Sequence, residues 1–311
     1  MPFLATSPDT AGPDRTRAAY CQYPMDEVMI MAKFLGPLLA VASVFGASRP
    51  GMLVTTDWLA QHSKDAKVVI LHVAPNRTVY DAGHIPGARF IALKEIAVTR
   101  DGIPNELPPD ADLKKVLEAA GVSSDLRVIL YSDASVLPAT RAYFTLDYLG
   151  HGEQTALLDG GLDKWRSEGR ELIKDAPSPA QGSFTPHPKP ELAVQMDAVK
   201  RMSEPGSDLL LDVRSAADFR GEKGAHIAGA VNAFWMENQS SRENQALKSE
   251  QDLRKLYEGL GVSPERRVVT YCNSGMQASQ SYFTLKYLGY DVRLYDGSMS
   301  EWTAKGGPVE K

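Results

Sequence analysis

The residue best suited to covalent chemistry in this sequence is Cys272, one of two cysteines among 311 residues. It follows the apolar run 268–271, and the next three residues, 273–275 (Asn-Ser-Gly), are typical of a turn. A helical pattern then begins near Gln277 or Ala278. The pattern predicts a strand, a tight loop and a helix, with the cysteine at the carboxyl end of the strand, where open parallel sheets bind their ligands.

The predicted loop would direct backbone N–H groups at the sulfur, and the N-terminus of the helix would point toward it. We therefore expect the thiol pKa to be lowered and the nucleophilic thiolate to be favoured. A thiolate can take the outer sulfur of a donor as a persulfide and pass it to an acceptor. Gly275 would let the loop turn tightly. The loop residues expected around a substrate are Asn273, Ser274, Gly275, Met276 and Gln277.

By residue type alone, Cys272 would more often be a buried structural cysteine than a nucleophile. Its surroundings favour the nucleophile. A cysteine loop of this kind also occurs in phosphatases and arsenate reductases. Those sites need an arginine that closes the loop and one more residue, whereas this chain has Ala278 and Ser279 after Gln277.

The sequence contains an internal repeat. Residues 121–150 match residues 261–289, and downstream residues 159–169 (DGGLDKWRSEG) match residues 296–306 (DGSMSEWTAKG). In the first copy Ser132 stands where the second has Cys272. A serine cannot form a persulfide, so we expect the first copy to be chemically inert and to form one wall of a cleft between the copies.

In each copy short apolar runs alternate with amphipathic segments, which predicts an α/β fold with a parallel sheet flanked by helices. The predicted organisation is a leader at 1–50, an inactive domain at 51–174, a linker at 175–191 and a catalytic domain at 192–311. The linker is rich in Pro, Ser and Gly.

Together the segments YCNSGMQA, LLDVRSAADFRG, GHIPGA with AHIAGA, and DGG/DGS followed by Trp resemble the tandem-domain rhodanese family of thiosulfate and 3-mercaptopyruvate sulfurtransferases. The resemblance covers about residues 51–311. It implies two rhodanese-like domains, of which the second is catalytic. It also implies a small sulfur donor and an acceptor that is cyanide or a thiol.

Asp212 and Arg214 end another predicted strand that should lie beside the cysteine loop. Arg214 and Arg220 are candidates to bind the anionic end of a donor, because a guanidinium suits oxyanions. Alternatively, Asp212 and Arg214 form a structural pair that braces the loop. The family often has a substrate-binding Arg where this chain has Asp218, so only Arg220 matches that part of the pattern.

Asn273 and Ser274 are closer to the small neutral residues of mercaptopyruvate enzymes than to the basic residues of animal thiosulfate enzymes. Bacterial members with neutral loops are also assigned to thiosulfate. We favour thiosulfate as the donor, since it is expected to be the more abundant one outside the cytoplasm. An alternative of another class is a non-catalytic persulfide carrier or sensor.

An apolar run near Lys33 is about as long as the core of a secretory signal peptide, which predicts export, as in a periplasmic bacterial enzyme. The chain would then start at Met29 or Met31. An uncleaved leader would instead anchor the protein to the membrane. Cys21 lies in this leader, so Cys272 would be the one thiol of the mature chain.

The formal net charge of −5 argues against a nucleic-acid partner. The six histidines show no spacing typical of metal ligands, so neither a metal nor a cofactor is predicted.

Overall fold

The computed structural model describes residues 47–311, except 176, 179, 203–207, 223 and 242–244. The start residues, the apolar run and Cys21 of the predicted leader lie outside the described residues. Among the residues that are described, no helix is both long and apolar enough to cross a membrane.

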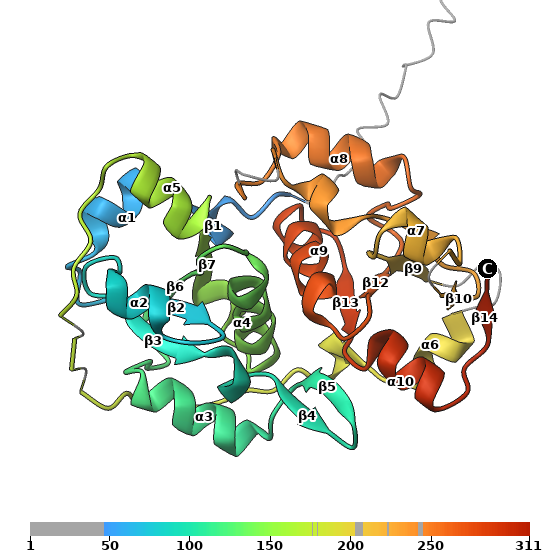
Figure 1. The fold of residues 1–311 in the computed structure, drawn as a ribbon, viewed down its shortest axis with the longest axis horizontal. Helices are drawn as coiled ribbons and strands as arrows, with labels where there is room; N and C mark the ends of the chain where they lie inside the picture. Colours follow the sequence, from blue (N-terminus) through green and yellow to red (C-terminus); the bar gives the residue numbers. More distant parts are fainter. Residues whose placement is uncertain (1–46, 176, 179, 203–207, 223, 242–244) are drawn as a thin grey trace, which may run out of the picture. The chain divides into compact units, whose positions relative to one another are not determined.

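The structure contains two five-stranded sheets, both entirely parallel (Figure 1). The strands of the amino-terminal sheet, in spatial order, are β1 (Leu53–Val54), β7 (Thr155–Leu158), β6 (Arg127–Tyr131), β2 (Val68–Ala74) and β3 (Arg89–Ala92). Those of the carboxy-terminal sheet are β8 (Ala193–Val194), β13 (Val292–Tyr295), β12 (Val268–Tyr271), β9 (Leu209–Asp212) and β11 (Val231–Asn232). Corresponding strands occupy corresponding places, so the predicted α/β fold with two repeated parallel sheets is confirmed.

Helices flank both sheets. In the amino-terminal domain they are α1 (Thr56–His62), α2 (Thr78–Ala82), α3 (Asp110–Ala119), α4 (Leu137–Tyr148) and α5 (Gly161–Ser167). In the carboxy-terminal domain they are α6 (Met196–Met202), α7 (Ala216–Phe219), α8 (Glu250–Glu258), α9 (Met276–Tyr287) and α10 (Ser298–Ala304). Short 3₁₀ helices are η1 (Pro50–Met52), η2 (Leu93–Glu95), η3 (Gly152–Gln154), η4 (Pro190–Leu192) and η5 (Trp235–Asn238).

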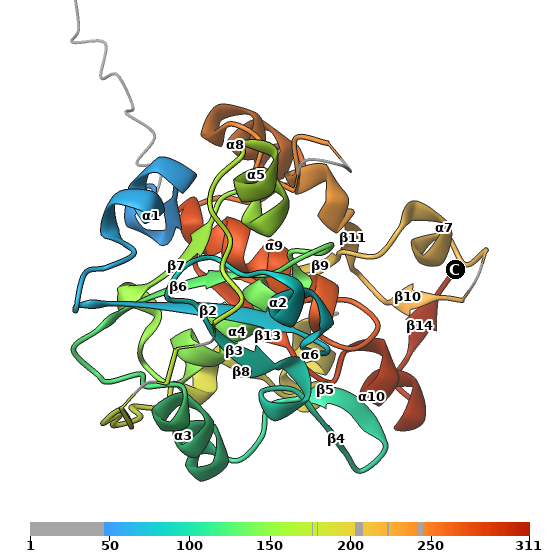
Figure 2. The same cartoon turned by 60° about the vertical axis from the view of Figure 1, so that its left-hand side comes forward.

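Two small antiparallel pairs complete the fold. They are β4 (Val98–Arg100) with β5 (Ile103–Glu106), and β10 (His226–Ile227) with β14 (Val309–Glu310). The β4–β5 hairpin belongs to the amino-terminal domain but lies beside α10 of the other domain, as Figures 1 and 2 both show. It therefore brings amino-terminal residues close to the loops of the carboxy-terminal sheet.

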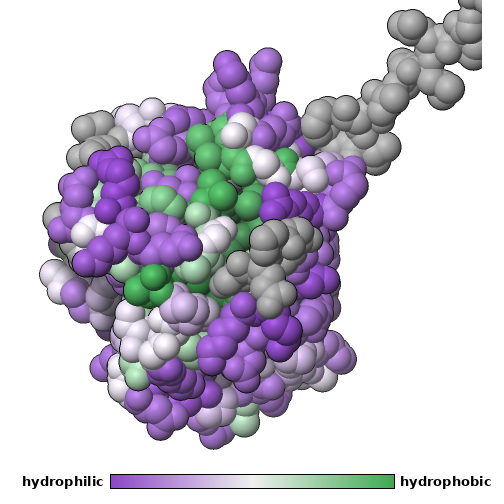
Figure 3. Space-filling view, turned by 90° about the vertical axis from the view of Figure 1, so that its right-hand side faces the viewer, coloured by the Kyte–Doolittle hydropathy of each residue, from purple (hydrophilic) through white to green (hydrophobic). Residues whose placement is uncertain are grey.

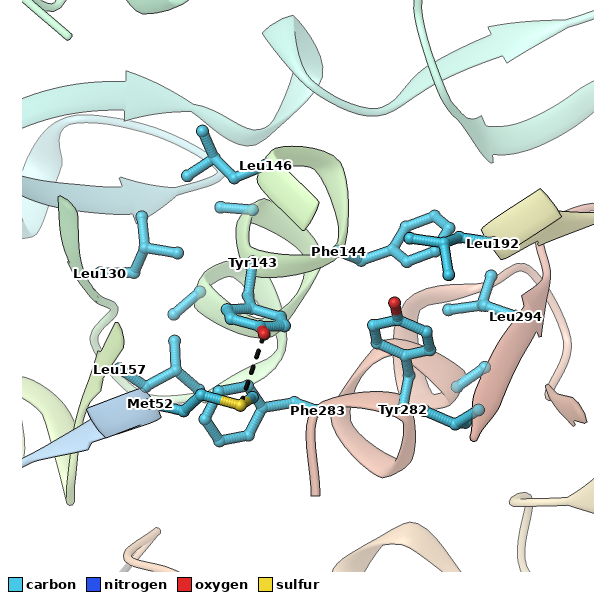
Figure 4. Close-up of a cluster of buried hydrophobic side chains, with 14 of the residues drawn as sticks. Met52, Leu130, Tyr143, Phe144, Leu146, Leu157, Leu192, Tyr282, Phe283 and Leu294 are labelled. Atoms are coloured by element: carbon cyan, nitrogen blue, oxygen red, sulfur yellow. Dashed lines mark hydrogen bonds between the residues drawn. The ribbon is translucent and has the colours of Figure 1, made fainter. Parts of the chain in front are cut away.

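The outer face of each sheet has a core of its own. One core packs α1 and α5 on the amino-terminal sheet, and the other packs α6 and α10 on the carboxy-terminal sheet. The inner faces share a single core, in which α4 and α9 pack together (Figure 4). Tyr143 meets Phe283, and Phe144 meets Tyr282, each pair in an edge-to-face arrangement. The two domains are thus joined through continuous apolar packing.

The predicted linker is held along the amino-terminal domain. Phe184 is buried in the shared core, and its N–H donates to Glu118 Oε1 at 3.0 Å. Further along, the N–H groups of His187 and Lys189 donate to the carbonyls of Leu149 and Tyr148. The described linker residues therefore pack on the first domain over much of their length.

Candidate active site

Cys272 lies directly after β12, in the middle of the carboxy-terminal sheet, and α9 begins at Met276. The helix starts one residue earlier than the sequence pattern indicated, because Gly275 caps it in the left-handed region at φ 78°. A Cβ at Gly275 would lie 2.7 Å from Asp296 Oδ1 and 3.1 Å from Arg141 Nη1. Both the backbone angle and the available space therefore require glycine here.

The thiol of Cys272 is free, and the residue is 1% exposed. Burial raises the pKa of the Cys272 thiol above its usual range, while hydrogen bonds from the N–H groups of Ala278, Ser274, Gln277 and Gly275 act in the opposite direction. The expectation of a lowered thiol pKa was therefore wrong in direction. The predicted cradle of amides is present, but desolvation of the buried sulfur outweighs it.

The turn between β13 and α10, together with the start of α10, holds the cysteine loop through hydrogen bonds. Ser298 Oγ accepts hydrogen bonds from the N–H groups of Cys272 (3.2 Å) and Gly275 (3.1 Å). The Met299 N–H donates to the Cys272 carbonyl at 3.0 Å, and Ser300 donates to the Asn273 carbonyl from both its N–H and its hydroxyl. These bonds fix the loop backbone around the sulfur.

Asp212 and Arg214 form a buried ion pair at the end of β9. Arg214 Nε lies 3.0 Å from Asp212 Oδ1, and Nη2 donates to Asp212 Oδ2 at 2.6 Å and to the Ala225 carbonyl at 2.8 Å. Nη1 lies 3.4 Å from Asn273 Oδ1. Because these partners engage all three guanidinium nitrogens, the geometry favours the bracing alternative for Arg214.

Arg220 follows α7 on the surface and forms an ion pair with Glu222, with Nη2 and Oε1 3.1 Å apart. Among the described residues, no hydrogen bond or ion pair joins Arg220 to the cysteine loop. Its predicted role in substrate binding is therefore without support from these contacts. Asp218 is also engaged locally, because its N–H and carboxylate both bond the hydroxyl of Ser215 at the start of α7.

The remaining predicted site residues belong to the cysteine loop and the first turn of α9. Asn273 is exposed, whereas Ser274, Met276 and Gln277 are half-buried. Asn105, in strand β5 of the β4–β5 hairpin, donates from Nδ2 to Ser274 Oγ at 2.9 Å. The amino-terminal domain thus contacts the cysteine loop directly through Asn105.

A buried ion pair also links the domains beside the loop. Arg141 of α4 is fully buried and binds Asp296 with both terminal nitrogens; the Nη2 to Oδ2 distance is 3.0 Å. Asp296 Oδ2 also accepts the Leu107 N–H at 3.0 Å. In the corresponding place of the repeat, Asp159 Oδ1 accepts the Leu247 N–H at 3.1 Å.

A pocket of about 340 Å³ lies between the domains. Its walls include Glu106 and Leu107 from the first domain and Asp296, Gly297 and Glu301 from the second. The predicted interdomain cleft therefore has a counterpart, but its lining reaches the turn behind the cysteine loop and does not include the cysteine.

Partly buried and exposed apolar side chains also occur in the carboxy-terminal domain. Phe234 and Trp235 follow β11 and are half-buried, and Val309 is 45% exposed. On the face of this domain that Figure 3 shows, hydrophobic residues gather in an area bordered by hydrophilic ones. Polar contacts in the loop are thus accompanied by apolar surface on the same domain.

The loop of the first copy differs in its bonding. Ser132 Oγ donates to the Ser135 carbonyl at 2.6 Å, so the hydroxyl is engaged within its own loop. Asp133 accepts a hydrogen bond from His72, at 3.0 Å from Nε2, and this bond lowers the pKa of the Asp133 carboxyl. This arrangement is compatible with the expected chemical inertness of the first copy.

Four residues at the site were not identified from the sequence: Asn105, Arg141, Asp296 and Ser298. For Ser298 a signal was present, because the paired DGG and DGS segments differ at this position. Asn105 and Arg141 come from the other domain, and no local pattern connects them with Cys272. Among the described residues, no group of three or more His, Cys, Asp or Glu side chains is arranged to hold a metal.

Comparison with known proteins is consistent with this geometry. A sequence model of the Rhodanese-like domain matches residues 55–168 and 195–305. The sulfur carrier protein TtuD of Thermus thermophilus is 35% identical, over 86% of this chain and 99% of that protein. The 3-mercaptopyruvate sulfurtransferase of Escherichia coli K12 is 31% identical, over 83% of this chain and 97% of that enzyme.

Among solved structures, the protein EanB is similar in a state described as a cysteine persulfide with ergothioneine. The TM-score is 0.76 at 25% identity, and the match covers 84% of this chain and 70% of that chain.

Proposed function

The chain belongs to the rhodanese family of sulfurtransferases, as two tandem copies of the domain, and from this premise we propose that it transfers sulfur through a persulfide on Cys272. The observation that carries the proposal is the buried free thiol at the end of the central strand β12, with four backbone N–H groups directed at its sulfur. The N–H groups favour an anionic sulfur, and burial of the site admits little water.

The first step is attack of the Cys272 thiolate on the outer sulfur of thiosulfate. The sulfur–sulfur bond of the donor breaks, sulfite leaves with the electron pair, and the enzyme keeps a persulfide anion. Cyanide or a thiolate then attacks the outer sulfur of the persulfide. The new sulfur–sulfur bond breaks, the Cys272 thiolate is regenerated, and thiocyanate or an acceptor persulfide is released.

The role of the loop N–H groups follows from the raised pKa of the Cys272 thiol. The charge of a persulfide lies one atom farther from the buried cysteine than the charge of the thiolate does. The outer sulfur can therefore meet the N–H groups at the mouth of the loop without the full desolvation cost of the inner sulfur. In this proposal the loop stabilises the persulfide intermediate more than the free thiolate, which favours sulfur loading.

Thiosulfate is the proposed donor, with 3-mercaptopyruvate as the alternative, in which the thiol proton moves to carbon as pyruvate leaves. The test uses the purified full-length chain with each donor and with cyanide as acceptor. We expect thiocyanate to form from at least one donor, with kcat/KM for thiosulfate the higher of the two. A higher kcat/KM for 3-mercaptopyruvate would overturn the donor assignment but keep the persulfide mechanism.

A persulfide carrier is the second candidate. It is favoured by the similarity to the sulfur carrier protein TtuD. A carrier would gain the mass of one sulfur atom on Cys272 after incubation with a donor, yet would not turn over with cyanide. The same experiment, followed by intact mass measurement, therefore separates the two functions.

We also propose that the protein is exported through the apolar leader segment, which accords with thiosulfate as the donor. Fractionation of the producing cells is expected to find the chain in the periplasm, shortened by about the length of a leader. Recovery of the intact chain from the cytoplasm would contradict export. Recovery of the intact chain in the membrane fraction would indicate an uncleaved anchor.

A further inference from the structure

Ser298 has a backbone conformation that side chains rarely adopt. Its φ is 48°, in the left-handed region, and the residue is fully buried. In the repeated segment of the first domain the equivalent residue is Gly161, at φ 55°. The turn therefore requires a left-handed residue in both copies, and the second copy places a serine where glycine would be unstrained.

The hydroxyl of Ser298 is fully used. It accepts the N–H of Cys272 and the N–H of Gly275, and it donates to the Tyr295 carbonyl at 2.9 Å. One side chain thus holds both ends of the cysteine loop and ties them to the end of β13. The first copy has no room for this arrangement, since a Cβ on Gly161 would lie 2.9 Å from the Ser132 carbonyl oxygen.

The hydrogen bonds of Ser298 determine which backbone N–H groups of the loop remain available to the Cys272 sulfur. The Cys272 N–H is turned away to Ser298, and that of Gly275 is shared between Ser298 and the sulfur. The N–H groups of Ser274, Gln277 and Ala278 remain directed at the sulfur. Without the hydroxyl, the buried N–H of Cys272 would lose its acceptor and that of Gly275 would keep only the sulfur, so the loop would have to rearrange to satisfy the Cys272 N–H.

We propose that Ser298 is a positioning residue for sulfur transfer, whose hydroxyl shapes the cysteine loop so that its free amides face the reacting sulfur. This inference rests on the proposed function of Cys272 and adds a residue that acts through the loop backbone. The second domain, which carries Cys272, has the strained residue Ser298 at this turn. The first domain, which carries Ser132 at the cysteine position, has the unstrained Gly161 there.

Two variants separate the hydroxyl from the backbone strain. Ser298→Gly removes the hydroxyl and relieves the left-handed strain, whereas Ser298→Ala removes the hydroxyl and keeps the strain. We expect Ser298→Gly to unfold at a higher temperature than Ser298→Ala. Both variants should nevertheless lower kcat by between about tenfold and about a hundredfold, with KM changed much less.

The decisive readout needs neither donor nor acceptor. The rate at which iodoacetamide alkylates Cys272 is measured against pH, and both variants are expected to shift this profile upward by about half a pH unit or more, because fewer ordered N–H groups stabilise the thiolate. Thr303→Ala, which removes from an exposed residue of the same helix a hydroxyl that bonds the Met299 carbonyl, should leave kcat and the profile unchanged.

A Ser298→Gly variant with the parent profile and the parent kcat would overturn the proposal. It would show that any loss in Ser298→Ala follows stability alone. If the parent protein shows no turnover with either donor, the proposed function fails. The alkylation profile of the variants then still decides whether Ser298 positions the loop.

Discussion

Replacing Cys272 with serine is expected to abolish sulfur transfer, with a loss of about a thousandfold or more in kcat/KM, equivalent to about 4 kcal/mol in transition-state stabilisation. An alcohol is a far weaker nucleophile than a thiolate at neutral pH, and its oxygen cannot hold a transferable sulfur as a persulfide. The variant should also gain no sulfur mass after incubation with a donor. Thiocyanate formation and intact mass measure the two effects.

The substitution should leave the fold intact. Ser132 occupies the equivalent position of the first domain, where a buried serine follows the central strand β6 and donates within its own loop. We expect the unfolding free energy of Cys272→Ser to lie within about 1 kcal/mol of the parent value, which thermal and urea unfolding can check.

The matched control is Ser132→Cys in the Cys272→Ser background. The first loop has one residue more than the second and carries the His72–Asp133 pair beside it. A cysteine there should not restore transfer. Activity of Cys272→Ser within tenfold of the parent would contradict the role of Cys272, and activity restored by Ser132→Cys would contradict the inertness of the first domain.

The second large effect concerns stability. Arg141→Met should lower the free energy of unfolding by about 3–5 kcal/mol, because it leaves the Asp296 carboxylate buried without its cationic partner. The same change should reduce activity, since Arg141 Nη1 lies 3.1 Å from the position a Gly275 Cβ would take and helps confine the loop. Urea unfolding of the purified variant measures the first effect.

A double variant and a surface control test the cause. Arg141→Met with Asp296→Asn removes both charges and should recover part of the lost stability, as expected when an unpaired buried charge causes the damage. Arg220→Met breaks the exposed pair with Glu222 and should change stability by less than about 1 kcal/mol. Equal losses from Arg141→Met and Arg220→Met would contradict the importance of the buried pair.

Several features of the fold follow from local patterns and were predictable for that reason. The alternation of strands and helices and the internal repeat indicate two parallel α/β domains, and the structure confirms both. The place of Cys272 at the end of a strand follows from the same patterns, since a turn of Asn, Ser and Gly must end the run 268–271.

The electrostatic balance at the site was not predictable in this way. The sequence indicates amides directed at Cys272, and those amides are present. The direction of the pKa shift depends on how deeply the thiol is buried, and Cys272 belongs to the core that the two domains share. Likewise, the position of Arg214 after β9 does not reveal that Asp212, Ala225 and Asn273 engage its guanidinium.

The two repeated domains, the difference between Ser132 and Cys272, and the strand, loop and helix around the cysteine follow from local patterns in the chain. The contacts of Asn105 and Arg141 in the first domain with the loop and the turn of the second are seen only in the folded protein. The physical reason is the separation along the chain over which each kind of interaction acts. Periodicity and turn residues act over a few positions, whereas these contacts join residues 169 and 155 positions apart, which only the shared core of α4 and α9 brings together.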